Sequence, residues 1–445
     1  MQEVSVIREL MSSRRFAPLF WAQFCAALND NVLRNALVIM LVYGPTSGRG
    51  DALVPVAGAV FIFPFFILSG LGGELADKYV RSLMARRLKF AEIFAAGFVA
   101  TGFFLHSIPL LFVALFLFGA FAALFGPVKY AILPDQLSVG ELATGNALVE
   151  GATFVAILIG TIAGGLLVSG STHMGFVASV IMLLALLSWA FASRIPATKP
   201  AAADLVITAN PLTSTLRLLK SLYAEPRLWD GMVIVSWFWL AGAVALSLLP
   251  TIVKDIVGGL EAVVTLCLAI FTIGIGAGSL FAARLSHVRP NLTLVPLGAV
   301  IMGISGLDIA WTVGHATAGS SITPAAFVTS LSGARMIAGF AIFAFGGGLF
   351  VVPVFAAVQA WAAPSERARV IAAGNVLQAG FMVVGSLFVA LLEAAGVAIS
   401  WIFLGLALAC LGSVFFVLGK WGKEAASGFG ALTFQNLFRK EQERA

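Results

Sequence analysis

The chain has 445 residues, of which 60% are hydrophobic and only 11% are charged, with a formal net charge of +6. Soluble domains are about one quarter charged, so this composition excludes a soluble domain and indicates an all-α polytopic membrane protein. The apolar runs are continuous and do not alternate, which excludes an outer-membrane barrel. The three cysteines, Cys25, Cys267 and Cys410, lie within apolar runs at spacings that suggest neither a metal site nor a disulfide framework.

The N-terminal segment, residues 1–16, contains no apolar core or cleavage site of a signal peptide. Apolar side chains from Val4 to Met11 instead recur at helical spacing, with Arg8 beside them. This pattern predicts a short amphipathic helix that lies on the cytoplasmic membrane surface as an anchor.

The first predicted span, residues 17–43, is apolar except for a polar stripe at its centre. At about 1.5 Å per residue, Asp30 lies near the bilayer midplane, where an ionised side chain costs at least ~2.5 kcal/mol. Asp30 and Arg34 are four residues apart, so they share a helix face on which they can neutralise each other. Asn31 and Asn35 lie beside them. Such a stripe faces a wet passage or a polar contact between helices, and we predict that these four residues bind substrate.

Twelve apolar segments predict twelve membrane-spanning helices. The predicted spans are residues 17–43, 53–73, 86–106, 109–128, 141–169, 174–193, 227–250, 260–283, 292–314, 335–360, 368–394 and 396–420. With both termini in the cytoplasm, 23 of the 27 lysines and arginines fall in cytoplasmic segments, Arg34 lies within the first span, and only Arg49, Lys254 and Arg335 fall outside. This positive-inside bias supports an even number of spans and this orientation.

One long polar connection divides the spans into two groups of six. The predicted parts are an amphipathic segment (1–16), an N-terminal six-helix bundle (17–193), a cytoplasmic linker (194–226), a C-terminal six-helix bundle (227–420) and a basic amphipathic cytoplasmic tail (421–445). Within the linker, residues 212–223 are amphipathic and are expected to lie along the membrane surface.

A short internal repeat supports two related halves. GNALVEG at 145–151 and GNVLQAG at 374–380 share the spacing Gly-Asn-x-Leu-x-x-Gly and begin predicted spans that are six helices apart. Together with the central linker and the cytoplasmic termini, the repeat predicts two pseudo-symmetric halves of six helices. This is the organisation of the major facilitator superfamily.

The loop after the second span, GLGGELADKYVRSLMARR, resembles the Gly-x-Leu-Ala-Asp-Arg-x-Gly-Arg signature of that superfamily at Gly73, Asp77, Lys78 and Arg81. Glycine allows close approach of neighbouring helices. Asp77 can accept hydrogen bonds from Arg81 or from a helix N-terminus across a cytoplasmic seam. We predict that these four residues form a gate, as opposed to a loop of solvated charges.

A second polar cluster lies in residues 126–154, and we predict that it also binds substrate. Lys129 and Tyr130 lie at the end of the fourth predicted span, where Lys129 could instead extend to the membrane interface. Glu150 is about 13 Å inside the fifth span, with Asn146 one turn before it on the same face. A carboxylate at that depth needs a partner, for which Arg34 and Lys129 are the candidates.

Several stretches resemble the lysophospholipid transporter (LplT) family of the major facilitator superfamily. They are AQFCAALNDNVLRNAL, GPVKYAIL, GNALVEGATFVAILIGTIAGG and GGLFVVPVFAAVQ. The resemblance implies a twelve-helix fold that moves lysophospholipids, such as lysophosphatidylethanolamine, from the outer to the inner leaflet of a bacterial inner membrane by alternating access. It also implies reacylation there, with an acyltransferase/acyl-acyl-carrier-protein synthetase as partner, beside the surrounding membrane lipids. The seventh span lacks the basic residue expected in this family.

The placement of charge agrees with a lipid cargo, because mid-membrane charges gather in the first half and the second half is apolar. We expect the phosphate to contact Arg34 or Lys129 and the ammonium to contact Asp30 or Glu150. Two alternatives remain: a proton-coupled exporter of amphipathic drugs or siderophores, and a membrane anchor that regulates an acyltransferase. No nucleotide-binding loop, metal set or nucleophile constellation is present, so we expect no enzymatic activity, no cofactor and no nucleic-acid partner.

Overall fold

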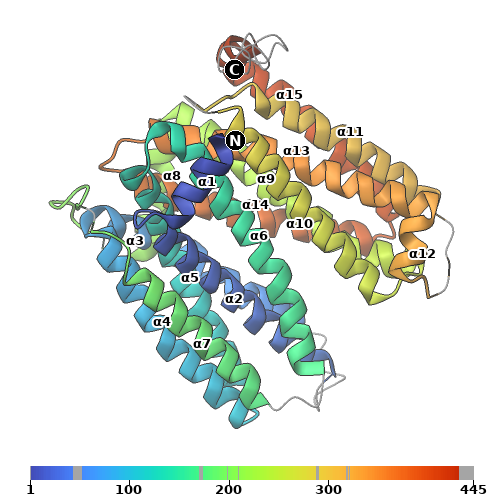
Figure 1. The fold of residues 1–445 in the computed structure, drawn as a ribbon, viewed down its shortest axis with the longest axis horizontal. Helices are drawn as coiled ribbons and strands as arrows, with labels where there is room; N and C mark the ends of the chain where they lie inside the picture. The colour runs from blue at the N-terminus through green and yellow to red at the C-terminus, as the bar shows by residue number, and fades with distance from the viewer. Residues whose placement is uncertain are drawn as a thin grey trace. The chain divides into compact units, whose positions relative to one another are not determined.

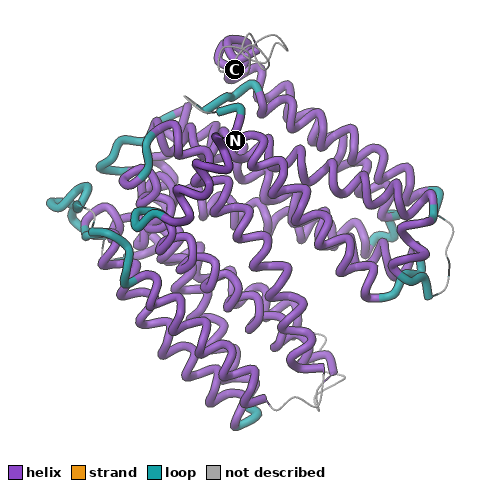
Figure 2. Tube along the Cα trace, viewed as in Figure 1, coloured by secondary structure: helices purple, strands orange, loops and turns teal. Residues whose placement is uncertain are grey.

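A computed structural model describes residues 2–43, 53–169, 174–197, 199–208, 210–286, 290–316, 319 and 321–429. Within these ranges the regular elements are helices, joined by short loops (Figure 2). The helices are α1 (Gln2–Ser12), α2 (Ala17–Tyr43), α3 (Leu53–Lys78), α4 (Arg81–Phe104), α5 (Ile108–Gln136), α6 (Val139–Ser169), α7 (Met174–Ala192), α8 (Pro211–Ala224), α9 (Pro226–Thr251), the π-helical turn η1 (Ile252–Val257), α10 (Glu261–Arg284), α11 (Leu294–Gly314), α12 (Pro324–Thr329), α13 (Leu331–Trp361), α14 (Arg367–Ala394) and α15 (Ile399–Phe429). The prediction of an all-α membrane fold is confirmed.

Ten of the described helices are long and apolar enough to cross a membrane. The other two predicted spans correspond to α2, with 27 residues, and α4, with 24 residues. Both are long enough to span a bilayer, and both carry charged side chains near the middle of their length. The last helix, α15, continues to Phe429, and the rest of the predicted tail, residues 430–445, lies outside the described residues.

Three predicted helix boundaries were wrong, and each matters for the site. Helix α3 continues to Lys78 and α4 begins at Arg81, so the signature residues, predicted in a loop, lie on helices or at their ends. Helix α5 continues to Gln136, so Lys129 and Tyr130 lie within a helix and not at its end. The predicted bounds were set where apolar residues give way to charged residues. In the structure, charged side chains at these helix ends have buried hydrogen-bond partners, so the helices extend beyond the predicted bounds.

The described chain forms two compact units. The first comprises Met1–Ser236 and Val358–Gly380, and the second comprises Trp237–Ala357 and Phe381–Ala445. In the first unit, α2 packs along α6 and α7, α4 packs along α5 and α7, and α3 packs on α5 (Figure 1). Its apolar core joins α2, α4, α5 and α7, with Leu37, Val99, Leu115 and Ile181 fully buried. In the second unit, α11 packs along α15.

Helices α2 and α6 approach closely because α6 carries glycine at two positions one turn apart. A Cβ atom added at Gly160 would lie 2.6 Å from the Cβ of Asn31, and one added at Gly164 would lie 2.9 Å from the Cβ of Asn35. The small-xxx-small spacing therefore brings the polar stripe of α2 directly against α6.

The linker helix α8 packs on α3. Asn210 caps its first turn by accepting from the backbone N–H groups of Leu212 and Thr213. Glu74 of α3 is buried and accepts from the Thr208 backbone N–H at 2.7 Å, the Thr208 hydroxyl at 2.9 Å and the Ser214 hydroxyl at 2.8 Å. The predicted amphipathic helix therefore exists, and its buried face contacts protein.

The N-terminal helix α1 is held against α6 through the short connection that follows it. Leu10 and Phe16 are fully buried, and the guanidinium of Arg15 donates to the carboxylate of Glu141. This hydrogen bond, with the charge of Glu141, raises the pKa of Arg15 above its usual value. The predicted surface anchor is thus also tied to the bundle.

Candidate functional site

The central charges of α2, Asp30 and Arg34, do not form the predicted direct ion pair. Arg34 donates to the side-chain oxygen of Asn31 at 2.8 Å, and among the described residues no base lies within 4.0 Å of the Asp30 carboxylate. Asp30 is instead within electrostatic reach of Glu92, Lys89, Arg34 and Lys129. Asp30 therefore interacts with charged groups on α2, α4 and α5 and not with Arg34 alone.

The two asparagines of the stripe are engaged locally. Asn31 donates to the carbonyl of Ala27 at 2.7 Å, and Asn35 donates to the carbonyl of Asn31 at 2.9 Å and to the hydroxyl of Thr161 at 3.3 Å. Both lie against the glycines of α6; Asn31 orients Arg34, and Asn35 joins α2 to α6 through Thr161.

Sequence analysis missed a buried ion pair in α4. Lys89 donates to Glu92 at 2.6 Å, and each side chain is only 2% exposed. The Lys89 ammonium also lies 4.3 Å from the ring centroid of Phe125, which is a cation–π contact. By sequence, Lys89 counts among the cytoplasmic charges at the start of the predicted span 86–106, and it was not paired with Glu92. The signal that could have found the pair is the three-residue spacing of Lys89 and Glu92 on one helix face.

Glu150 of α6 has a different hydrogen-bond partner from those predicted. The hydroxyl of Tyr130 in α5 donates to one carboxylate oxygen of Glu150. The other oxygen, Oε2, is buried and accepts no hydrogen bond within the described structure. Lys129 is within electrostatic reach of Glu150 and Asp30, and its ammonium lies 4.5 Å from the Tyr130 ring centroid.

These groups make one charged cluster in the first unit, carried by α2, α4, α5 and α6. Its members are Asp30, Arg34, Lys89, Glu92, Lys129 and Glu150. Three carboxylates face three bases, so the cluster is neutral when all six are ionised. Of these six described residues, only Lys89 and Glu92 form a direct ion pair with each other. The others keep capacity for a ligand that carries charges of both signs.

Asn146 has a buried partner that the sequence did not reveal. It donates to Gln359 at 2.6 Å, and Gln359 donates back at 3.1 Å. Both side chains are fully buried, and Gln359 also donates to the backbone carbonyl of Tyr130 at 3.4 Å. This amide pair joins α6 to the end of α13 within the first unit.

The signature residues Asp77 and Arg81 lie at the centre of a buried network. Arg81 donates to Asp77 at 2.8 Å and to Asp135 of α5 at 2.7 Å, and its side chain is only 1% exposed. Arg81 also donates to the carbonyl of Pro364 at 3.2 Å. Arg367 lies 3.6 Å from Asp135. Asp77 and Arg81 are therefore buried and paired, and they are not solvated loop charges.

Asp77 accepts hydrogen bonds from both kinds of donor that the sequence suggested, an arginine and a helix N-terminus. Besides Arg81, the backbone N–H groups of Ala368 and Arg369, in the first turn of α14, donate to its carboxylate at 3.1 and 3.2 Å. The Arg369 guanidinium donates to it at 3.2 Å. At Gly73, an added Cβ would lie 2.6 Å from the Cβ of Ala372, so glycine permits this approach of α3 to α14.

Lys78 is the one predicted gate residue that takes no part in the described network. Its ammonium lies 5.9 Å from the ring centroid of Tyr79. The remaining predicted residues divide between the buried network around Asp77 and Arg81, where Gly73 also lies, and the region of the charged cluster.

Residues 19–334 match the family model of the Major Facilitator Superfamily. A protein of Serratia proteamaculans named lysophospholipid transporter LplT is 27% identical over 374 residues, which cover 82% of this chain and 83% of that protein. A Yersinia pestis protein of the same name is 27% identical over 384 residues, covering 84% of each chain. These matches confirm the family resemblance seen in the sequence.

Solved transporter structures share the fold at low sequence identity. The human organic anion transporter MFSD10 (TETRAN) superposes with a TM-score of 0.73 at 17% identity, covering 91% of this chain and 99% of that one. A bacterial homologue of the iron transporter ferroportin, in an outward-facing state, superposes with a TM-score of 0.67 at 13% identity, covering 92% and 99%.

Proposed function

We propose, from the premise that the chain belongs to the Major Facilitator Superfamily, that it is a lysophospholipid transporter. The observation that carries the proposal is the charged cluster of the first unit, which presents a lysine and a carboxylate oxygen without a direct ionic partner among the described residues. The name of the curated relatives, lysophospholipid transporter, supports the same cargo.

A lysophospholipid head carries a phosphate and, in the ethanolamine form, an ammonium. In the proposed complex, Lys129 contacts the phosphate and Glu150 Oε2 accepts from the ammonium, each as a charge-assisted hydrogen bond. Tyr130 holds the other oxygen of Glu150 and so fixes the direction of Oε2. Asp30 and Arg34 complete the site, while Asn31, Asn35 and Asn146 position its helices.

Transport in this proposal proceeds by alternating access from the outer to the inner leaflet of a bacterial inner membrane, where the cargo is reacylated by an acyltransferase/acyl-acyl-carrier-protein synthetase. The network of Asp77 and Arg81 forms in one state and opens in the other. The positive-inside distribution of lysine and arginine supports cytoplasmic termini. The protein itself carries out no covalent chemistry.

The test is uptake of radiolabelled lysolipids into vesicles that contain the purified full chain. Lysophosphatidylethanolamine and lysophosphatidylglycerol share the phosphate but differ in the ammonium. Glu150→Gln should lower the preference for the ethanolamine form on the order of tenfold, the equivalent of one charge-assisted hydrogen bond. Lys129→Ala should reduce uptake of both lipids, because both carry the phosphate.

The matched control is Glu393→Gln, which removes an exposed carboxylate of α14 and should leave the headgroup preference unchanged. No lysolipid uptake by the wild-type protein, together with export of amphipathic drugs, would replace the proposal with the exporter alternative. Absence of both activities would favour the membrane anchor.

A further inference from the structure

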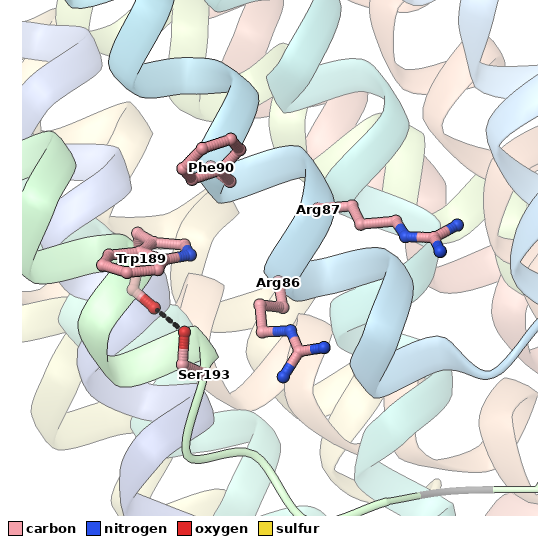
Figure 3. A pocket seen from close by; sticks show the side chains of 5 residues that line it. All are labelled: Arg86, Arg87, Phe90, Trp189 and Ser193. Atoms are coloured by element: carbon pink, nitrogen blue, oxygen red, sulfur yellow. Dashed lines mark hydrogen bonds between the residues drawn. The ribbon is translucent and has the colours of Figure 1, made fainter.

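A groove of about 520 Å³ lies on the outside of the first unit, between the beginning of α4 and the end of α7. Its lining residues are Arg86, Arg87, Phe90, Trp189 and Ser193 (Figure 3). Helices α4 and α7 pack along each other, so the groove follows a continuous helix seam. It is separate from the charged cluster, whose nearest member in sequence, Lys89, points into the bundle and is buried.

The two arginines of the groove are exposed, and neither forms an ion pair with a carboxylate among the described residues. Their side chains leave α4 in different directions. The Arg86 side chain extends to the level of Ser193, whereas that of Arg87 extends away from Trp189 (Figure 3). The groove therefore offers an unneutralised guanidinium beside an aromatic wall.

An apolar surface continues from these arginines along the seam. Phe90 lies 5.7 Å from Trp189 and 5.4 Å from Phe94, measured between ring centroids. Phe94 is 62% exposed, and Phe98, one turn further on, is 43% exposed. On the α7 side, Leu183, Leu186 and Leu187 are also exposed. In a spanning helix such a surface faces lipid chains.

We infer that this groove binds an anionic diacyl phospholipid of the predicted cytoplasmic leaflet as a structural ligand, distinct from the transported lysolipid. The phosphate contacts Arg86, with Arg87 adding charge, and an acyl chain lies along Phe90, Phe94 and Phe98. Basic pockets between spanning helices on the cytoplasmic side are suited to such headgroups, and tryptophan is favoured at the level of the headgroups.

The position of the groove argues against the cargo as the occupant, and charge complementarity argues against the ethanolamine form of the cargo. The groove opens to the outside of the helix seam, and its charged residues are arginines without a facing carboxylate. A zwitterionic headgroup would leave its ammonium beside two guanidiniums. A lipid with a net negative headgroup satisfies the site more fully.

The experiment is native mass spectrometry of the full chain in detergent, titrated with phosphatidylglycerol or with phosphatidylcholine of the same acyl chains. Wild-type protein should retain phosphatidylglycerol preferentially. The double variant Arg86→Gln, Arg87→Gln should lose affinity for it on the order of tenfold or more. The single variant Arg86→Gln should lose more affinity for phosphatidylglycerol than Arg87→Gln, because the Arg86 side chain lies nearer the groove (Figure 3).

The matched control is Lys199→Gln, Lys220→Gln, which removes the same charge from exposed positions outside the groove and should retain the lipid. Phe94→Ser should weaken retention without a change of charge. The inference is overturned if the arginine variant and the lysine control retain phosphatidylglycerol equally. It is also overturned if lysophosphatidylethanolamine displaces the lipid at equal concentration, or if inorganic phosphate does so.

Discussion

Neutralising Asp77 should shift the gate equilibrium by an amount that the structure allows us to work out. In Asp77→Asn the side-chain volume is kept and the charge is lost. The carboxylate accepts from Arg81, from the Arg369 guanidinium and from two backbone N–H groups. Arg81 keeps Asp135 as a partner and is not left without a carboxylate, so the loss is the charge of the bonds that Arg81, Arg369 and the two backbone N–H groups donate to Asp77.

Hydrogen bonds to charged groups contribute about 1.5–3 kcal/mol each. We expect a net loss of about 2 kcal/mol, because the asparagine oxygen retains part of the acceptor role. That corresponds to a shift on the order of thirtyfold away from the state in which the network is formed. Transport should slow, while the affinity of the charged cluster for lysolipid should change little.

The assay has two arms on the same purified protein: initial rates of lysolipid uptake into vesicles, and labelling by a thiol reagent of a cysteine introduced at Ala372. That residue lies against Gly73 in the formed network, so opening the network should expose it. The matched control is Asp308→Asn, which breaks an ion pair with Arg335 on a more exposed surface and is worth about 0–1 kcal/mol. If Asp77→Asn changes neither rate nor labelling, the network is not a gate.

Three further perturbations test contacts elsewhere in the first unit. Gly160→Ala should reduce the yield of folded protein, because the new methyl group meets Asn31, whereas Gly97→Ala, where an added Cβ has no neighbour within 4 Å, should not. Gln359→Leu should lower the free energy of unfolding by about 1–3 kcal/mol by leaving the buried side-chain oxygen of Asn146 without its donor, and addition of Asn146→Leu should restore part of the loss. Glu74→Gln should accelerate proteolysis of the linker on the order of tenfold, because charge-assisted bonds to Thr208 are weakened, and equal cleavage rates would contradict the docked linker.

The sequence alone determined the membrane class, the helix order, the internal repeat and the family, because these depend on hydropathy and on local spacing. It also identified Asp77 together with both kinds of donor that the structure shows, the neighbouring arginine and a helix N-terminus. The charges that a bilayer disfavours stood out in α2 and α6 because they interrupt long apolar runs.

Only the tertiary structure decided which of these groups are partners. Asp30 and Arg34 share a helix face but are not ion-paired within the described residues, since Arg34 contacts Asn31. Glu150 is held by Tyr130 from another helix. Gln359 meets Asn146 across 213 residues of sequence. Local spacing restricts which side chains share a helix face. Helix packing sets which faces come into contact, and a buried charge or amide finds its hydrogen-bond partner only in that contact.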